Sequence, residues 1–499
     1  MKKLLLMFFA ILFLACAERK SEVDFGMEYN KMWGAGDKPQ WVLNHGIFEQ
    51  TAVNWSTGKH TATPVPLGAV GPKKYLKMLS GIIQNTDIAK TLKLAVSENV
   101  NVILVIGDGM GFGHLSLPIF NNIARENGEQ TYFEKITKDG TTGIVFTNPY
   151  KEIITSSAAA ATAIASGTKT RVGMLGLGPN GKRVETILDV AEKNNLSTGL
   201  ISEAPITHAT PAGFYGHSIS RSNQNLIAEQ LVNDNEIEVL LGGGAKFFIP
   251  ANTLTNDFDQ LKKINVSLQG KSARKDKKNL LKIMQNKGYE IVSTKDELSQ
   301  ISNKTKKLLG LFAANAMNAR IDRDNENTGE PSLVEMSEKA ITILQKNKKG
   351  YFLMIEAARI DWEAHANDAG AVLKAVEEMN DVLEYCYKVY KTNPKNTLLV
   401  FTADHETGGL GLSYYSLPKG KRIPIKLESG DIYTPTKFNL PFSDYLKLNK
   451  QNSTFEKIFT EKNDFNNFYK KISDNVGYKI DKTLARKIYE EISKFEGYK

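Results

Sequence analysis

Short, mostly apolar runs alternate along the chain with longer stretches in which apolar residues recur at helical spacing. The short runs predict strands of a buried sheet: Val102–Ile106, Thr198–Ile201, Glu238–Leu241, Phe352–Ile355 and Leu398–Phe401. The longer stretches predict helices: Ala158–Ala165, Glu185–Lys193, Asn223–Asn233, Leu333–Lys346 and Ala371–Val389. This alternation is typical of an α/β protein, and we expect a three-layer sandwich with a largely parallel central sheet.

Two of the predicted strands end in side chains that bind metal ions in other proteins. In YFLMIEAARIDWEAH the strand ends at Glu356, and the four-residue spacing of Asp361 and His365 places both on one face of a helical turn. In TLLVFTADHETGG, Asp404 and His405 follow the strand directly. The alternative is that all are buried polar residues satisfied by hydrogen bonds. We favour metal ligands, because such groups at two strand ends are costly as structure and useful at a metal site.

Two further segments carry groups that suit a phosphate site. Asp108 lies between two glycines after an apolar strand, so the backbone can turn tightly and bring the carboxylate close to a ligand. Asp-Gly is also an ordinary turn sequence. Ser156 and Ser157 begin an alanine-rich helix, whose free N–H groups and positive dipole end attract phosphate. A serine in this position is more often only an N-cap, so each segment alone gives weak support.

Together these segments resemble the alkaline phosphatase family, from about Trp55 to about Leu412. The matching motifs are GDGMG, the helix Ser157–Thr162, HATPAG, GHSISR, LLGGGAKFF, PSLVEMSEKAI, IEAARIDWEAHANDAG and TADHETGG. The resemblance implies a metal-dependent phosphomonoester hydrolase that releases inorganic phosphate from small esters through a phosphoserine intermediate. It also implies two Zn²⁺ ions and one Mg²⁺ ion as cofactors.

The resemblance also implies a set of metal ligands. Asp404 and His405 resemble ligands of one zinc ion, and Asp108 resembles a ligand shared between this zinc and magnesium. Asp361 and His365 resemble ligands of the other zinc ion. Mixed histidine and carboxylate sets suit catalytic zinc.

The remaining matches complete the expected site. Thr210 and Glu356 resemble the other protein ligands of magnesium, and oxygen ligands suit this hard ion. Ser157 resembles the nucleophile. Arg221 resembles the forked group that binds two phosphate oxygens. Paired metal ions can stabilise both the attacking and the leaving oxygen, so no histidine base is expected beside Ser157.

The order of the motifs differs from that of the family. The family places a further zinc-binding histidine in a GGHTA-like motif after the Asp-His strand, but no histidine follows His405 here. A matching motif instead surrounds His60, and the helix after it runs directly into the strand before Asp108. We therefore predict a circular permutation, with the usual termini fused near residues 96–102 and His60 completing the second zinc site. The alternative is a surface histidine and an incomplete site.

Two residues depart from the family pattern near the expected phosphate site. Ser156 stands where the family commonly has an aspartate that helps to hold the arginine, so we expect Arg221 to be less fixed. His208 occupies a position that is aspartate in some members and histidine in others. We expect His208 to tune the magnesium site through water.

The N-terminal segment of the chain predicts that the protein is exported. The first residues, MKKLLLMFFAILFLAC, indicate a signal peptide, and Cys16 resembles the lipidated cysteine of a bacterial lipoprotein, although Phe13 is unusual at its position. We predict a lipoprotein signal over residues 1–16, a lipid anchor on Cys16, and a periplasmic or cell-surface location at the membrane. Residues 17–54 and 413–499 carry no site motif and are expected to form a surface cap around a catalytic core of residues 55–412.

Charge adds little to this interpretation. The formal net charge is +9, which a generally lysine-rich composition explains more simply than steering of anionic phosphates. Nothing resembles a nucleic-acid-binding module. The predicted partners are small phosphomonoesters, the membrane through Cys16 and, as an option, a second copy of the chain in a homodimer.

Three other functions were weighed against the phosphomonoesterase. A sulfatase needs a modifiable cysteine or serine in its own motif, which the chain lacks. Phosphodiesterases of the same superfamily usually present threonine as the nucleophile and lack the pattern around Arg221. A lipoprotein that only binds ligands on a decayed phosphatase fold requires lost metal ligands, and every expected ligand type is present.

Overall fold

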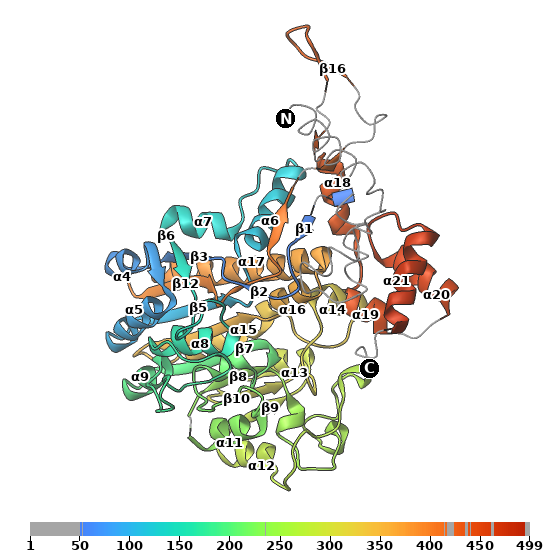
Figure 1. Ribbon diagram of the computed structural model, residues 1–499. Helices are drawn as coiled ribbons and strands as arrows, with labels where there is room; N and C mark the ends of the chain where they lie inside the picture. Colours follow the sequence, from blue (N-terminus) through green and yellow to red (C-terminus); the bar gives the residue numbers. More distant parts are fainter. Residues whose placement is uncertain are drawn as a thin grey trace, which may run out of the picture.

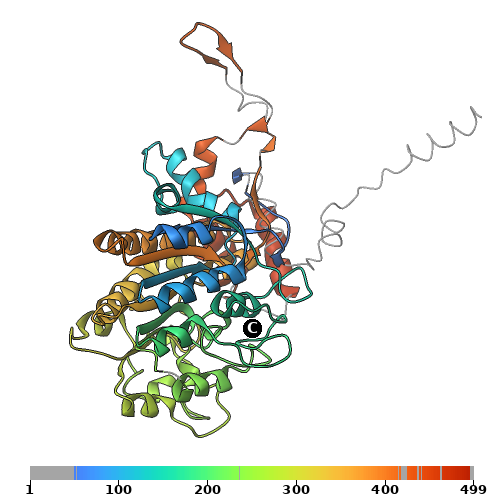
Figure 2. The same ribbon diagram turned by 90° about the vertical axis from the view of Figure 1, so that its left-hand side faces the viewer.

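The fold is built around one ten-stranded sheet with helices on both faces (Figures 1 and 2). The computed structural model describes residues 50–51, 53–234, 236–413, 415–416, 424–434, 438–439, 441–460 and 464–494. The predicted signal peptide, Cys16 and most of residues 17–54 lie outside the described residues. The predicted α/β sandwich is confirmed.

The sheet has the strand order β4-β6-β3-β12-β5-β11-β7-β8-β10-β9. Its strands are β3 (Val65–Val70), β4 (Gly81–Gln84), β5 (Asn101–Gly107), β6 (Thr141–Phe146), β7 (Ser197–Pro205), β8 (Val239–Gly243), β9 (Glu290–Val292), β10 (Leu308–Leu311), β11 (Tyr351–Ala357) and β12 (Thr397–Ala403). Strand β3 pairs antiparallel with both β12 and β6, and the other pairs are parallel. Every residue of β11 and β12 is buried, which explains their continuous apolar pattern.

Helices cover both faces of the sheet, which Figure 2 shows almost edge-on. One layer contains α5 (Asn85–Ser97), α8 (Ser157–Ser166) and α9 (Ile187–Lys193), and the other contains α7 (Tyr132–Asp139), α15 (Leu333–Leu344) and α17 (Ala369–Thr392). Further helices are α4 (Lys73–Met78), α6 (Phe112–Ala124), α10 (Ala209–Ala212), α11 (Gln224–Asp234), α12 (Leu280–Asn286), α13 (Lys295–Gln300), α14 (Arg320–Glu326) and α16 (Arg359–His365). Parallel strands leave their carboxyl ends on one edge of the sheet, and β5, β11 and β12 deliver the expected site residues there.

The N-terminal described segment lies alongside the chain that follows β12. Strand β1 (Val53–Trp55) pairs with β14 (Leu410–Leu412), and β2 (His60–Thr61) pairs with β13 (Glu406–Thr407), both antiparallel. Strand β3 continues this arrangement along β12. The chain from residue 53 to 70 therefore runs antiparallel to the chain from 397 to 412, and this pairing carries His60 to the same edge of the sheet as Asp404.

The C-terminal helices are attached to the core through two buried carboxylates, Asp322 and Asp368. These helices are α18 (Phe442–Tyr445), α19 (Phe455–Thr460), α20 (Phe465–Asn475) and α21 (Lys482–Lys494). Asp322 accepts hydrogen bonds from the Thr454 backbone N–H at 3.0 Å and hydroxyl at 2.7 Å. The role of residues 413–499 as part of a surface cap stays a prediction. Among the described residues, no helix combines the length and the apolarity needed to cross a membrane.

Asp368→Asn is expected to loosen this C-terminal attachment. Asp368 is buried at the start of α17 and accepts hydrogen bonds from Phe455 N–H at 2.7 Å, Gln451 Nε2 at 2.6 Å and Ala371 N–H at 3.1 Å. An asparagine replaces one acceptor oxygen by a donor, so one buried N–H loses its partner. We expect a loss of about 1–3 kcal/mol in the free energy of unfolding, measured by urea denaturation. Asp259→Asn, at a solvent-exposed aspartate, is the control and should change stability by less than about 0.5 kcal/mol; equal losses would contradict this account.

Candidate active site

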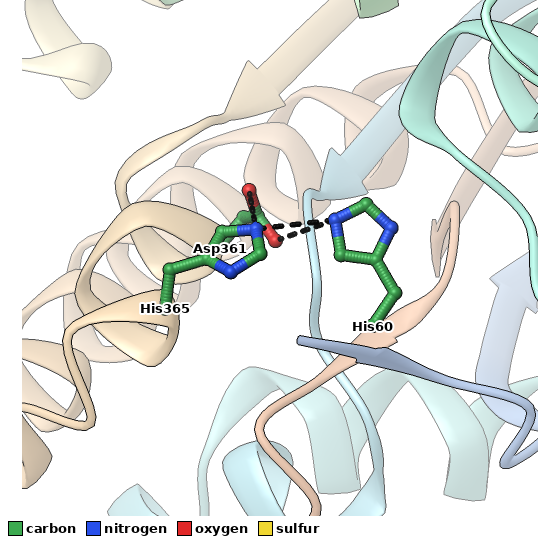
Figure 3. A group of neighbouring side chains, drawn as sticks. All are labelled: His60, Asp361 and His365. Carbon is green, nitrogen blue, oxygen red and sulfur yellow. Dashed lines mark hydrogen bonds and ion pairs between the residues drawn. The ribbon is translucent and has the colours of Figure 1, made fainter. Parts of the chain in front are cut away.

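His60, Asp361 and His365 meet at the carboxyl edge of the sheet, as Figure 3 shows. Nε2 of His60 lies 3.1 Å from Nε2 of His365 and 3.8 Å from Oδ1 of Asp361. Nε2 of His365 lies 3.4 Å from Oδ2 of Asp361. Two imidazole nitrogens and a carboxylate thus point at a common place, although His60 lies about 300 positions from its partners in sequence. The structure brings together the three residues that the predicted permutation required to be close.

The outer ring nitrogens of the two histidines are held by backbone carbonyls. Nδ1 of His60 lies 3.0 Å from the Thr155 carbonyl oxygen, and Nδ1 of His365 lies 2.9 Å from the Gly58 carbonyl oxygen. A carbonyl only accepts, so each Nδ1 carries the hydrogen and donates it. A neutral imidazole that donates from Nδ1 presents the lone pair of Nε2, which is the form in which histidine binds a metal ion.

A second group, fully buried, lies beside the first. Nε2 of His405 lies 3.5 Å from Oδ1 of Asp108 and 3.2 Å from Oδ2 of Asp404. Asp361 also belongs to this group, with its Oδ1 accepting from the Thr407 hydroxyl at 2.5 Å. Burial and the neighbouring His60 hold the pKa of His405 well below its usual value, so its imidazole is neutral.

The carboxylates of this region lack the positive charge that would compensate them. Burial, together with the nearby Asp404 and Asp361, raises the pKa of Asp108 well above its usual value. Burial raises the pKa of Asp404 to about 6 and that of Glu356 to about 7. One oxygen of Asp108, of Asp404 and of Glu356 is buried without a hydrogen-bond partner. Buried, unpartnered carboxylate oxygens are costly unless cations bind them, so these residues fit divalent ions.

Glu356 and Thr210 border Asp108 on the side away from His405. Thr210 Oγ1 lies 3.5 Å from Oδ2 of Asp108. Glu356, at the end of β11, accepts a hydrogen bond from the hydroxyl of Ser202, its register partner on β7. Ser202 could not be predicted as a site residue from the sequence, because its position opposite Glu356 depends on the strand register. Thr407 was not predicted either, although its place two residues after His405 on a strand is a usable signal.

Ser157 stands where these groups converge, at the N-terminus of α8. Its side chain is buried, and its Oγ lies 3.2 Å from Nε2 of His405 and 3.4 Å from Nη1 of Arg221. The preceding Ser156 caps the helix, since its Oγ accepts from Ala159 N–H at 3.4 Å. Ser156 also accepts from the backbone N–H of Gly173 at 3.0 Å. Ser156 therefore positions the helix start and the next loop, while Ser157 faces the site.

Arg221 is held by a histidine side chain and by the backbone of the loop at Gly173. Its Nη2 donates to Nε2 of His208 at 2.8 Å, and its backbone N–H donates to the Gly173 carbonyl at 2.9 Å. Burial and the adjacent Arg221 lower the pKa of His208 to about 3, so the ring is neutral and its Nε2 accepts. The His208 ring also makes an edge contact with Trp362, with centroids 5.7 Å apart. We expected His208 to act on the magnesium site through water; in the structure it contacts the arginine directly.

The fold and these side chains are those of an α/β-sandwich enzyme that acts on phosphate esters, with candidate ligands of divalent ions around a serine. The family model for alkaline phosphatase matches residues 99–479. The chain is 36% identical over 356 residues to alkaline phosphatase 4 of Bacillus subtilis, covering 69% of each protein. It is 34% identical over 372 residues to alkaline phosphatase 3 of the same organism, covering 72% of this chain and 73% of that one. The chain therefore belongs to the alkaline phosphatase family and is a phosphomonoester hydrolase.

A solved structure supports the same fold. The alkaline phosphatase of Thermus thermophilus superposes with a TM-score of 0.65 at 27% sequence identity. The superposition covers 80% of this chain and 77% of that chain. The family membership predicted from the motifs is confirmed; the individual ligand roles and the permutation stay predictions.

Proposed function

We propose that this protein releases inorganic phosphate from small phosphomonoesters through a phosphoserine on Ser157, with two Zn²⁺ ions and one Mg²⁺ ion as cofactors. The observation that carries the proposal is the position of Ser157 Oγ, 3.2 Å from His405 Nε2 and 3.4 Å from Arg221 Nη1. One zinc is assigned to His60, Asp361 and His365. The other is assigned to Asp404, His405 and Asp108, and magnesium to Asp108, Thr210 and Glu356.

The protein groups have separate tasks in this mechanism. Arg221 binds two oxygens of the phosphate with its forked guanidinium and turns the phosphorus toward Ser157. The Ser157 hydroxyl gives its proton to solvent as Oγ attacks phosphorus, the Oγ–P bond forms, the ester P–O bond breaks, and the leaving alkoxide takes up a proton from water. Water then hydrolyses the phosphoserine and frees phosphate. Bound metal ions supply the positive charge that stabilises the attacking and leaving oxygens.

The contact between Ser157 and His405 also raises the possibility of a serine esterase with a histidine base. In such a triad the carboxylate binds the ring nitrogen opposite the serine and orients the ring. Here both Asp108 and Asp404 approach Nε2, the same nitrogen that faces Ser157. The opposite nitrogen, Nδ1, lies 3.3 Å from the Thr407 hydroxyl. A ring whose Nε2 is surrounded by carboxylates and a serine is arranged as a metal ligand, which disfavours the esterase.

The proposed reaction is tested by comparing 4-nitrophenyl phosphate with bis(4-nitrophenyl) phosphate on the purified protein. We expect the monoester to be hydrolysed with a kcat/KM at least about a hundredfold higher, because it offers the metal ions of the proposed site a third unesterified oxygen and a second negative charge, whereas the diester has only the two oxygens that Arg221 binds. The metal content, measured by mass spectrometry, should approach two zinc ions and one magnesium ion per chain. A preference for the diester, or full activity without bound metal, would refute the proposal.

Substitutions of Arg221 and His208 should lower the catalytic activity in a coupled, non-additive way. Arg221→Ala is expected to lower kcat/KM by about 10²–10³-fold and to weaken inhibition by phosphate, because a desolvated bidentate contact is lost. His208→Ala should cost about tenfold in the wild-type background and less than twofold in the Arg221→Ala background, because it acts by holding the guanidinium. The double-mutant cycle is read out in kcat/KM and in the inhibition constant of phosphate. Equal His208→Ala losses in both backgrounds would show that His208 acts independently of Arg221 and would contradict this account.

We propose that the motif order is circularly permuted, and the strand pairing supports this. Val53 lies opposite Leu412, and His60 lies opposite Thr407, so the two segments resemble the arms of one hairpin opened at its tip. At the other junction, α5 leads into β5 through only three residues, 98–100. The family-model match begins at residue 99, at that junction. The new termini would then lie at the opened tip of the hairpin.

We further propose that Cys16 carries a lipid anchor and that the enzyme is exported to the periplasmic or cell-surface side of the membrane. The support is the signal-like sequence before Cys16. Cys16→Ser is expected to move the protein from the membrane to the soluble fraction or to block its processing. Mass spectrometry of the mature N-terminus measures the outcome, and a wild-type N-terminus well beyond residue 16 without lipid would contradict it.

A homodimer is also proposed. The hairpin of β16 (Ile425–Lys426) and β17 (Ile432–Tyr433) projects from the body of the protein in Figures 1 and 2. Ile425 and Ile432 on this hairpin are 53% and 73% exposed, which suits a contact with a second copy. Light scattering that gives a monomer mass at micromolar concentration would refute it.

A further inference from the structure

Four branched apolar side chains are exposed on three loops around the nucleophile: the loop before Ser157, the loop at Gly173 and the loop that carries Arg221. Their exposed fractions are 74% for Ile153, 50% for Ile154, 44% for Val172 and 73% for Ile219. We call these four residues the apolar rim. Single exposed apolar residues are ordinary on a protein surface, but four on loops that converge at one site need a reason.

Hydrogen bonds join each of these loops to the catalytic site. Ile154 precedes Thr155, whose carbonyl accepts from Nδ1 of His60 at 3.0 Å. Val172 precedes Gly173, which donates to the Ser156 hydroxyl at 3.0 Å and accepts from the Arg221 N–H at 2.9 Å.

The third loop is joined to the second by a strand-like bridge. Ile219 follows Ser218, whose backbone N–H and carbonyl pair with Leu175 at 3.0 and 2.8 Å. Ile219 also lies two residues before Arg221. The apolar rim therefore belongs to one hydrogen-bonded unit with Ser157 and Arg221, and its distance from the phosphate site is set by these bonds.

In-line attack determines where the rest of the substrate lies. When Ser157 Oγ attacks phosphorus, the leaving oxygen is on the opposite side, and Ser157 itself is buried. The leaving group consequently extends away from the buried nucleophile toward the surface.

We propose that the apolar rim binds the apolar part of the leaving group, so that the enzyme favours alkyl and aryl phosphates over esters of small polar alcohols. This inference rests on the proposed function, because it requires phosphate to be bound between Ser157 and Arg221. Contact with the rim removes apolar surface of both partners from water, which lowers the free energy of the bound ester and of its transition state.

The size of the effect follows from the openness of the apolar rim. One methylene in an enclosed apolar pocket changes kcat/KM by about 10-fold or more. An exposed rim removes only part of the methylene surface from water, so about twofold per methylene is expected. The n-alkanols from ethanol to hexanol have nearly the same acidity, so a change along this series reports binding and not leaving-group chemistry.

The test measures kcat/KM for ethyl, butyl and hexyl phosphate. Wild-type protein should gain about 16-fold from ethyl to hexyl, which differ by four methylenes. The triple variant Ile153→Ser, Val172→Ser, Ile219→Ser should gain less than about twofold, while its kcat/KM for ethyl phosphate stays within about twofold of wild type. Ile82→Ser is the matched control, because Ile82 on β4 is also 74% exposed, and it should keep the wild-type gain.

A flat series in the wild-type protein overturns the inference, and so does a wild-type gain in the triple variant. If the triple variant keeps that gain but changes its oligomeric state or its binding to phospholipid vesicles, the apolar rim serves another partner and the inference is also overturned. Failure of the metal-loaded wild type to hydrolyse ethyl phosphate at all refutes the proposed function, and the rim inference with it. If kcat/KM does not depend on chain length, the apolar-rim inference fails but the proposed phosphomonoesterase function is unaffected. The two failures are therefore distinguishable.

Discussion

Replacing Ser157 with alanine is expected to abolish the phosphoenzyme and to lower kcat for a monoester by at least about a thousandfold. Ser157 Oγ is the one hydroxyl that contacts both His405 and Arg221 among the described hydrogen bonds. Its loss leaves water as the attacking group, which lacks the fixed orientation of a covalently held nucleophile. Acid quenching with labelled phosphate measures the phosphoenzyme, and steady-state assays measure kcat.

The neighbouring serine offers a matched control. Ser156→Ala removes the helix cap and the hydrogen bond to Gly173 but leaves the Ser157 hydroxyl in place. It should lower stability by about 1 kcal/mol and kcat by less than about tenfold. Retention of a labelled phosphoenzyme in Ser157→Ala, or a larger loss in Ser156→Ala, would assign the nucleophile elsewhere.

The second large effect is expected for His60→Ala. His60 supplies one of the two imidazole nitrogens that face the space beside Asp361, and the other comes from His365. Removing it leaves two ligands where a catalytic zinc usually has three, so we expect the loss of about one zinc ion per chain and about a hundredfold or more in kcat/KM. The site of Asp404 and His405 should stay mostly filled.

Zinc content by mass spectrometry and activity at saturating zinc measure this outcome. His217→Ala is the control, because His217 is partly buried and lies outside both candidate metal groups. It should change neither zinc content nor kcat/KM by more than about twofold. Full zinc occupancy in His60→Ala would contradict the assignment of His60 as a zinc ligand. It would also contradict the proposal that the permuted motif order supplies the zinc-binding histidine that is missing after His405. Thermal unfolding separates metal loss from misfolding, since metal binding also stabilises the fold.

The central part of the sheet was predictable and its edges were not. The five predicted strands correspond to β5, β7, β8, β11 and β12, which lie next to one another in the sheet and are almost entirely buried. Burial on both faces requires a continuous apolar run, which is visible in a sequence. Strands β4, β6 and β10 were not predicted, and β3 and β9 were indicated only by the family resemblance. Strand β6 alternates buried and exposed residues, and β9 has only three, so neither leaves a comparable pattern.

In the candidate site, too, local spacing was predictable from the sequence, whereas contacts between distant segments were not. The spacing of Asp361 and His365 is local, so one helical turn suffices to place them together whatever the rest of the chain does. His60 reaches them only because β1, β2 and β3 pair with β14, β13 and β12. The family resemblance suggested where His60 belongs, but the hydrophobic pattern around it contains no information about that pairing.

The sequence by itself determined the α/β class, the family, and the residue types that can bind metal ions and phosphate, because these depend on short-range spacing and on side-chain chemistry. The tertiary structure alone decided which groups face one another. It placed Ser202 beside Glu356 through the strand register, and it turned Nε2 of His208 toward Arg221. Ser156 accepts from the Gly173 N–H and so supports the loop that holds the backbone of Arg221; a looser guanidinium stays a prediction. Such contacts depend on side-chain directions set by packing between distant segments, and a linear pattern does not record them.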